Sequence, residues 1–253
     1  MNSIDLNCDM GESFGMYKMG FDEEVIKFIS SANIACGFHA GDPVWMKRTV
    51  ELAEQHSVGV GAHPSFPDLN GFGRRSMDLS AEEVKSDMIY QIGALKSFTK
   101  NNKLQHVKPH GALYNQAVND EVLARSICEA VLEVDSDMIL VALSGSRWVE
   151  IANEMGIKVA REIFADRAMN NDGTLVSRSQ PGSVLHDVNE VVDRSIRMVT
   201  EGIAVTADGG EIEVAAESIC VHGDTEGAVD MARELRVGFE KARIKLVSLA
   251  EIV

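Results

Sequence analysis

The sequence has few cysteines, and none of them are paired at a short spacing. Its four cysteines are Cys8, Cys36, Cys128 and Cys220, and no two of them form a C-x-x-C motif. This pattern argues against a zinc knuckle and against the disulfide framework of a small secreted domain. We therefore expect free thiols and a protein of the reducing cytoplasm.

Positive charge is also scarce. The chain has 24 Lys and Arg against 39 Asp and Glu, which gives a net charge of −15 and a pI near 4.9. A broad basic surface for nucleic acid is not expected on such a chain. The N-terminus has no basic region, long apolar stretch or cleavage site, so we expect neither a signal peptide nor a membrane span.

Two common catalytic motifs are missing. The sequence has no G-x-x-x-x-G-K-[ST] and no H-E-x-x-H. These absences argue against a Walker-type phosphate loop and against a zinc site on one helix. Any active site must therefore be assembled from residues scattered along the chain.

What the chain does contain is a regular alternation of short apolar runs and longer amphipathic stretches. With 253 residues, 45% of them hydrophobic, it can bury a full core, and no linker or low-complexity tract divides it. We expect a single domain over residues 1–253. Strands are predicted at 3–7, 32–36, 58–62, 105–108, 138–142, 158–163, 203–206 and 218–222. Helices are predicted near 22–30, 43–56, 80–100, 119–133, 146–155, 187–201 and 225–240.

Repeated strand–helix units predict a parallel sheet with right-handed crossovers, which is either an open doubly wound sheet or a closed barrel. Seven or eight units in about 250 residues fit a barrel better. Residues 203–222 break the alternation, because two apolar runs flank "ADGGEIEV" as in a hairpin insertion. The expected fold is an α/β, TIM-like barrel of seven βα units with one irregular hairpin.

Polar residues recur where the predicted strands end. They are Asn7, Asp9 and Glu12; His39 and Asp42; His63; Lys108 and His110; Glu162, Asp166 and Arg167; and His222 and Asp224. The carboxyl ends of barrel strands share one face, where barrel enzymes carry their active sites. A single histidine is more often structural, and Asp42 and Asp224 can simply cap helices. Recurrence at five or six strand ends favours a functional site.

Several imidazoles beside carboxylates can act as metal ligands or as general acids and bases near neutral pH. The scattered spacing does not itself support a zinc site. A few cations also stand out on this acidic chain, namely Arg74, Arg75, Lys108, Arg147 and Arg167. They indicate a bound carboxylate or phosphate, although surface salt bridges are the alternative for Arg74 and Arg147.

Longer strings around these residues carry a family resemblance. They are "DLNCDMGESFG", "ANIACGFHAGDP", "GAHPSFPD" with "GFGRR", "VKPHGALYN", "EIFADR" and "CVHGD", in order along nearly the whole chain. They resemble the lactam utilisation family, which is identified with the A subunit of the bacterial 5-oxoprolinase. The resemblance implies a seven-fold barrel similar to the polysaccharide deacetylases. It also implies ATP-dependent opening of 5-oxo-L-proline to L-glutamate, in a complex with two other subunits, B and C.

The resemblance suggests roles for the polar residues. We expect Lys108, Arg167, Asn7 and Asp42 to bind ATP, and Asp9 with Glu12 to lie near Mg²⁺. His39, His63, His110 and His222 are candidates for proton transfer and lactam binding, together with Glu162 and Lys108.

Two other functions stay open at this point. One is a metal-dependent amide or ester hydrolase that works without ATP, and the other is a non-catalytic subunit that binds oxoproline. Calorimetry with oxoproline and with an ATP analogue separates them. The sequence also leaves open whether copies of the chain self-associate.

Overall fold

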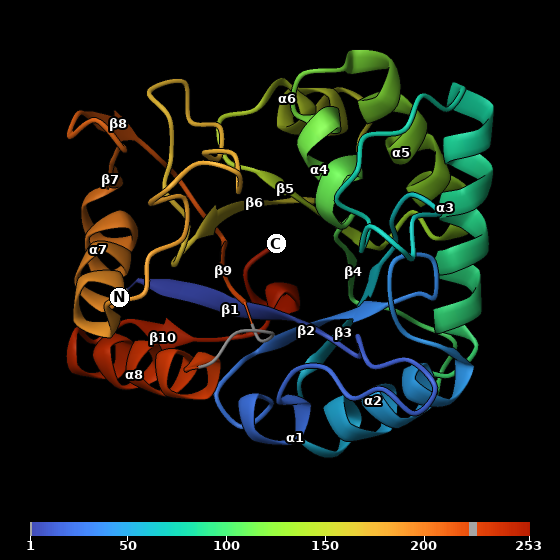
Figure 1. Ribbon diagram of the computed structural model, residues 1–253, viewed down its shortest axis with the longest axis horizontal. Coiled ribbons are helices and arrows are strands. Elements are labelled where there is room, and N and C mark those ends of the chain that lie inside the picture. The colour runs from blue at the N-terminus through green and yellow to red at the C-terminus, as the bar shows by residue number, and fades with distance from the viewer. Residues whose placement is uncertain (1, 223–226) are drawn as a thin grey trace.

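The centre of the molecule is a closed ring of parallel strands. The computed structural model describes residues 2–222 and 227–253. The ring strands are β1 (Ser3–Met10), β2 (Ser31–Ala35), β3 (Gly59–His63), β4 (His106–Val107), β5 (Ile139–Leu143), β6 (Val159–Phe164) and β9 (Ser218–Val221). Each pairs in parallel with the next, and β9 pairs with both β6 and β1, which closes the ring (Figure 1). The predicted seven-fold barrel is confirmed.

Helices surround the ring on its outside (Figure 1). They are α1 (Asp22–Val25), α2 (Pro43–Gln55), α3 (Ala81–Lys96), α4 (Gly111–Ala117), α5 (Glu121–Val134), α6 (Arg147–Glu154), α7 (Val188–Glu201) and α8 (Ala228–Lys241). Their starts follow local sequence chemistry, as in α3, where Ser80 and Glu83 form a capping box. None of the described helices is long and apolar enough to cross a membrane.

The structure corrects several predicted elements. The helix expected at 22–30 is only the four-residue α1. The side chain of its N-cap residue, Phe21, cannot accept a hydrogen bond from the first turn of the helix. The short helix α4 and the last strand, β10 (Lys245–Leu246), were not predicted. The hairpin near 203–222 exists, but its arms are β7 (Ile203–Val205) and β8 (Glu211–Glu213), while the second apolar run becomes ring strand β9. Asp224 and the predicted helix start at 225 lie outside the described residues.

The side chains that β1 points into the ring are polar. In β1, apolar residues alternate with Asp5, Asn7 and Asp9, which bond to residues of neighbouring strands inside the ring. Asp5, for example, accepts hydroxyl hydrogen bonds from Ser31 of β2 and Ser218 of β9. The apolar residues of β1 therefore pack toward the helices, and a column of polar groups leads through the ring toward its carboxyl end.

The other end of the ring is closed by the C-terminus. A short 3₁₀ helix, η1 (Leu249–Glu251), follows β10, which pairs with the beginning of β1. Leu249 is fully buried with Ile139, Val141 and Ala160 in a small apolar cluster. In Figure 1 the C-terminus appears within the outline of the ring. The open end is thus the one where the strands finish.

Asp5 makes stability depend on pH. Burial raises its pKa to about 6, in spite of the hydrogen bonds from Ser218, Ser31 and Ser30. An acid whose pKa is raised on folding binds its proton more tightly in the folded state, so stability falls as pH rises from about 4 to 6. We expect the free energy of unfolding of Asp5→Asn to fall by about 2–3 kcal/mol less than that of the wild type over this pH range. Urea unfolding at pH 4.5 and 7.5 tests this, with the exposed Asp137→Asn as the control that keeps the wild-type difference.

Candidate active site

A cavity of about 770 Å³ opens at the carboxyl end of the ring. Its lining includes Asp9, Glu12, His63, Lys108, His110, Arg167 and His222. These residues come from segments far apart in the sequence, as expected for βα loops of one barrel. Asn7, His39 and Glu162 lie in the second layer behind the lining and contact it through Lys108 and Glu12. The structure therefore brings together nearly all of the predicted site residues.

Lys108 forms the charged floor of the cavity. Its Nζ lies 3.2 Å from Asp9 Oδ1 and 3.0 Å from Glu162 Oε1, and it donates to Asn7 Oδ1 at 3.2 Å. Burial alone would lower the pKa of Lys108, but its partners, Asp9 first and then Cys220 and Glu162, hold that pKa well above its ordinary value. The side chain is 2% exposed, so this is a fixed ammonium between two carboxylates rather than a mobile surface cation.

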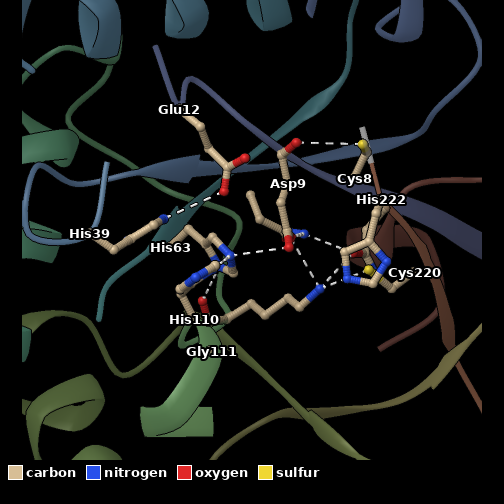
Figure 2. Close-up of polar contacts among 12 residues, drawn as sticks. Cys8, Asp9, Glu12, His39, His63, His110, Gly111, Cys220 and His222 are labelled. Atoms are coloured by element: carbon tan, nitrogen blue, oxygen red, sulfur yellow. Dashed lines mark hydrogen bonds and ion pairs between the residues drawn. The ribbon is translucent and has the colours of Figure 1, made fainter. Parts of the chain in front are cut away.

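Asp9 stands between Lys108 and the histidines. Its Oδ1 also accepts from Asn33 Nδ2 at 2.8 Å, and its Oδ2 lies 3.3 Å from His63 Nε2. Burial would raise the pKa of Asp9, yet His63 and Lys108 hold it well below its ordinary value. Figure 2 shows Asp9 pointing between the His63 side and the His222 side of the site. Asp9 is therefore ionised.

Three histidines pack against one another beside Asp9. The rings of His39 and His110 are stacked with centroids 3.8 Å apart, and His63 meets His110 edge-on at 4.8 Å. Burial lowers the pKa of both His39 and His110 well below the ordinary value. His39 Nε2 is 3.6 Å from Glu12 Oε1 (Figure 2). The stacked pair therefore consists of neutral imidazoles at pH 7.

His222 lies on the other side of Asp9 (Figure 2). Its Nδ1 is 2.8 Å from Asp166 Oδ2, and its Nε2 is 2.7 Å from Arg178 Nη2. A guanidinium only donates, so Nε2 accepts and Nδ1 carries the proton that goes to Asp166. Asp166 thus fixes one tautomer of His222, and the nitrogen with the lone pair faces an arginine that also lines the cavity.

The two remaining predicted nucleotide ligands have structural partners. The guanidinium of Arg167 lines the cavity but donates to the carbonyl oxygens of Ser183 and Val176, and burial lowers its pKa to about 10. Asp42 caps α2 and accepts a hydrogen bond from the N–H of Gly15. It is not among the described residues that line the cavity. The placement of Asp42 at the site is therefore corrected: its carboxylate is used as a helix cap.

Sequence reasoning missed three contributors. Asn33 bonds both Asn7 and Asp9, although it sits in a run that looks like a plain apolar strand. Tyr114 and Phe164 line the cavity, and burial, then the charge of Glu162, raises the pKa of Tyr114 well above its ordinary value. The available signal for Asn33 was its period-2 position, which points it to the same side as the polar residues of β1.

Two sets of side chains in the described chain could hold a metal ion. One contains Glu12, His39, His63 and His110, and the other contains Asp9, Cys220 and His222. Within each set the donor atoms lie within 4.8 Å of one another. The first set is richer in imidazole, and three of its four members line the cavity.

Comparison with known proteins agrees with this fold. The LamB/YcsF family model matches residues 4–253. The A subunit of 5-oxoprolinase from Thermococcus sibiricus is 55% identical over 252 residues, covering 99% of each chain. The solved lactam utilization protein from Thermus thermophilus has a TM-score of 0.91 and 46% identity, covering 97% of this chain and 99% of that one.

A more distant structure shares the fold alone. The T48 deacetylase, solved with substrate, has a TM-score of 0.52 at 15% identity and covers 99% of this chain and 90% of that one. The likeness shows that the two chains share the barrel fold, and it does not assign deacetylase chemistry to this chain. The family model and the close relatives together span almost the whole sequence, and the chain therefore belongs to the LamB/YcsF family.

Proposed function

We propose that this chain is the subunit of an ATP-dependent 5-oxoprolinase that binds 5-oxo-L-proline and opens its lactam to give L-glutamate. The observation that carries the proposal is the buried ammonium of Lys108, held at the cavity floor beside ionised Asp9 and a group of neutral histidines. The relatives named as the A subunit of 5-oxoprolinase support the substrate, and their name supports assembly with further subunits, here B and C. Four free, buried thiols fit a reducing cytoplasm.

The coupling to ATP has a physical reason. In a five-membered lactam the amine and the acyl group are held together, so reclosure has a high effective molarity and simple hydrolysis gains little driving force. In our proposal the lactam oxygen attacks the γ-phosphorus of ATP and ADP leaves. Water then adds to the carbon that carries the phosphate, and the C–N bond breaks as the nitrogen takes up a proton, which leaves the γ-carboxyl group as an acyl phosphate. A second water hydrolyses this acyl phosphate to the carboxylate of glutamate and releases phosphate.

The residues divide this work by position. Lys108 is aimed at the cavity floor and neutralises negative charge on the transferred phosphoryl group or the lactam oxygen. Arg167 supports the anion from the cavity wall, while Asn7 orients Lys108 from behind. In this scheme Mg²⁺ accompanies ATP, with Asp9 and Glu12 as the nearest carboxylates. The neutral histidines exchange protons with water and with the leaving nitrogen.

The direct test uses the assembled enzyme. With all subunits present, oxoproline-dependent ADP release is measured alongside glutamate formation, and the two are expected in equal amounts. Calorimetry on this chain alone then shows whether oxoproline and a non-hydrolysable ATP analogue bind here. Binding of oxoproline without nucleotide assigns ATP to another subunit, and turnover without ATP contradicts the proposal.

Asp166 offers a separate test of the histidine assignment. In Asp166→Asn the amide can donate to His222 Nδ1 and select the wrong tautomer, so we expect turnover to fall about 10²–10⁴-fold. The free energy of unfolding should change far less than turnover does. Glu150→Gln, on the exposed face of α6, is the matched control and should retain full turnover. Equal turnover in both variants would show that His222 does not take part in the reaction.

A further inference from the structure

Two buried imidazoles face each other in a way that their neutral forms cannot satisfy. His63 Nδ1 lies 2.6 Å from the carbonyl oxygen of Lys108, and His110 Nε2 lies 2.9 Å from that of Phe72. A carbonyl oxygen only accepts, so these two nitrogens carry the ring protons. The other nitrogens, His63 Nε2 and His110 Nδ1, are 2.9 Å apart, and if both rings were neutral each would present a lone pair to the other.

Two carboxylates also lie close to these histidines. Asp9 Oδ2 lies 3.3 Å from His63 Nε2, and the carboxylate of Glu12 has an oxygen within 4.8 Å of one ring nitrogen of each histidine. Lys108 already compensates the charge of Asp9. The two ring nitrogens, 2.9 Å apart, still need a cation between them, and that cation is either an additional proton on one ring or a metal ion.

The distances fit a metal ion. Two nitrogens at about 2.1 Å from a common ion are about 3.0 Å apart at the right angle of octahedral coordination and about 3.4 Å apart at the tetrahedral angle. The 2.9 Å between His63 Nε2 and His110 Nδ1 therefore matches octahedral coordination, and a tetrahedral ion requires the two rings to separate by about 0.5 Å. Carbonyl groups that hold the outer N–H of metal-binding imidazoles are a recurrent part of such sites. Here the Lys108 and Phe72 carbonyls do this for both rings.

We infer that His63, His110 and Glu12 bind a divalent transition-metal ion at the wall of the cavity. All three line the cavity, so an ion held by three protein ligands keeps a position open toward a bound molecule. His39 is stacked parallel to His110, so its ring nitrogens do not point at the same place. Within the described chain neither of these nitrogens has a hydrogen-bond partner, and we assign His39 to packing beside the ion.

The donor set also selects the kind of ion. Two imidazoles and one carboxylate suit Zn²⁺ and its first-row neighbours, whereas Mg²⁺ prefers oxygen ligands. Such an ion polarises a carbonyl oxygen or activates a bound water. Under this inference Glu12, His63 and His110 are metal ligands, which leaves Asp9 as the carboxylate near Mg²⁺ and His222 as the histidine that exchanges protons. Metal binding is measurable without ATP, substrate or partner subunits, so it stands or falls independently of the proposed function.

The wild-type chain provides the first test. After dialysis against EDTA and removal of the chelator, titration with Zn²⁺ by calorimetry is expected to show one ion bound per chain. Co²⁺ is expected to give the visible absorption bands of an ion with nitrogen ligands. If neither Zn²⁺ nor Co²⁺ binds at millimolar concentration, and nitrogen NMR finds one of the two rings protonated on both nitrogens, the cation is a proton and the inference is wrong.

Variants locate the ion. His63→Asn and His110→Asn are each expected to weaken Zn²⁺ binding by on the order of 100-fold or more, and His39→Asn by less than about 10-fold. The exposed His56→Asn is the matched control and should bind as the wild type does. Circular dichroism checks the fold, and Glu12→Gln provides a further ligand variant if a histidine variant does not fold. Loss of binding in Cys220→Ser with retention in His63→Asn would move the ion to the other set and overturn the assignment.

Discussion

Replacing Lys108 by Met is expected to lower the free energy of unfolding by about 3–5 kcal/mol at pH 7 and to abolish oxoproline-dependent turnover. Methionine keeps most of the length of the side chain, so little packing is lost. What is lost is the ammonium that faces Asp9 and Glu162, both of which remain in the ring. Breaking a buried ion pair from one side is costly because the partner charge is left without compensation.

The measurement is urea unfolding, followed by ADP release in the assembled enzyme. Lys47→Met is the matched control, because Lys47 is exposed on α2 and pairs with Glu51 at 3.9 Å. Such a surface pair contributes at most about 1 kcal/mol, so this variant should keep nearly all of its stability and its turnover. Wild-type turnover in Lys108→Met would refute the role of Lys108 in the reaction.

A double variant separates the charge effect from the chemistry. In Lys108→Met with Glu162→Gln, one of the two stranded carboxylates is neutral, so part of the lost stability should return, by about 0.5–3 kcal/mol. Turnover should not return, because the ammonium is still missing. For the single variant, the deficit in stability should be smaller at pH 5 than at pH 8, since carboxylates without a counter-charge take up protons more readily in acid.

Much of the fold and of the site could be predicted from periodicity and position. The alternation of strands and helices is a local pattern that predicts a barrel, and the rule that strand ends share a face places His63, Lys108 and His222 together before any coordinates are known. Each of these three residues ends or directly follows a ring strand, so its location depends on one local feature and one topological rule.

Position along a strand does not reveal what a side chain bonds. Asp42 lies in the same loop after β2 as His39, but the proline after Asp42 starts a helix, and the carboxylate of Asp42 accepts from the N–H groups of Val44 and Trp45. Asn7 was expected to contact nucleotide, yet it lies one layer below the cavity, bonded to Glu162 and Ser218. Separating these cases requires the register between strands, which depends on contacts among residues more than 100 positions apart.

Replacing Gly111 by Ala is expected to destabilise the protein by about 3–5 kcal/mol, the other large effect. Gly111 is the first residue of α4 and has a φ of +58°, which costs other residues about 1–2 kcal/mol. In addition, a Cβ at this position would lie 2.5 Å from the carbonyl oxygen of Gly73. That oxygen accepts the N–H of Ala112, so it cannot move away without breaking a backbone hydrogen bond.

Gly145→Ala separates the two contributions to this loss. Gly145 has a φ of +77°, but among the described residues a Cβ there meets nothing within 4 Å, so only the backbone cost of about 1–2 kcal/mol applies. Urea unfolding of both variants should therefore differ by the steric part, about 1–3 kcal/mol. His110 directly precedes Gly111, so Gly111→Ala should also move the imidazole and reduce turnover, whereas Gly145→Ala should not. Equal losses of stability in the two variants would mean that the contact between Gly111 and Gly73 does not constrain the histidine loop.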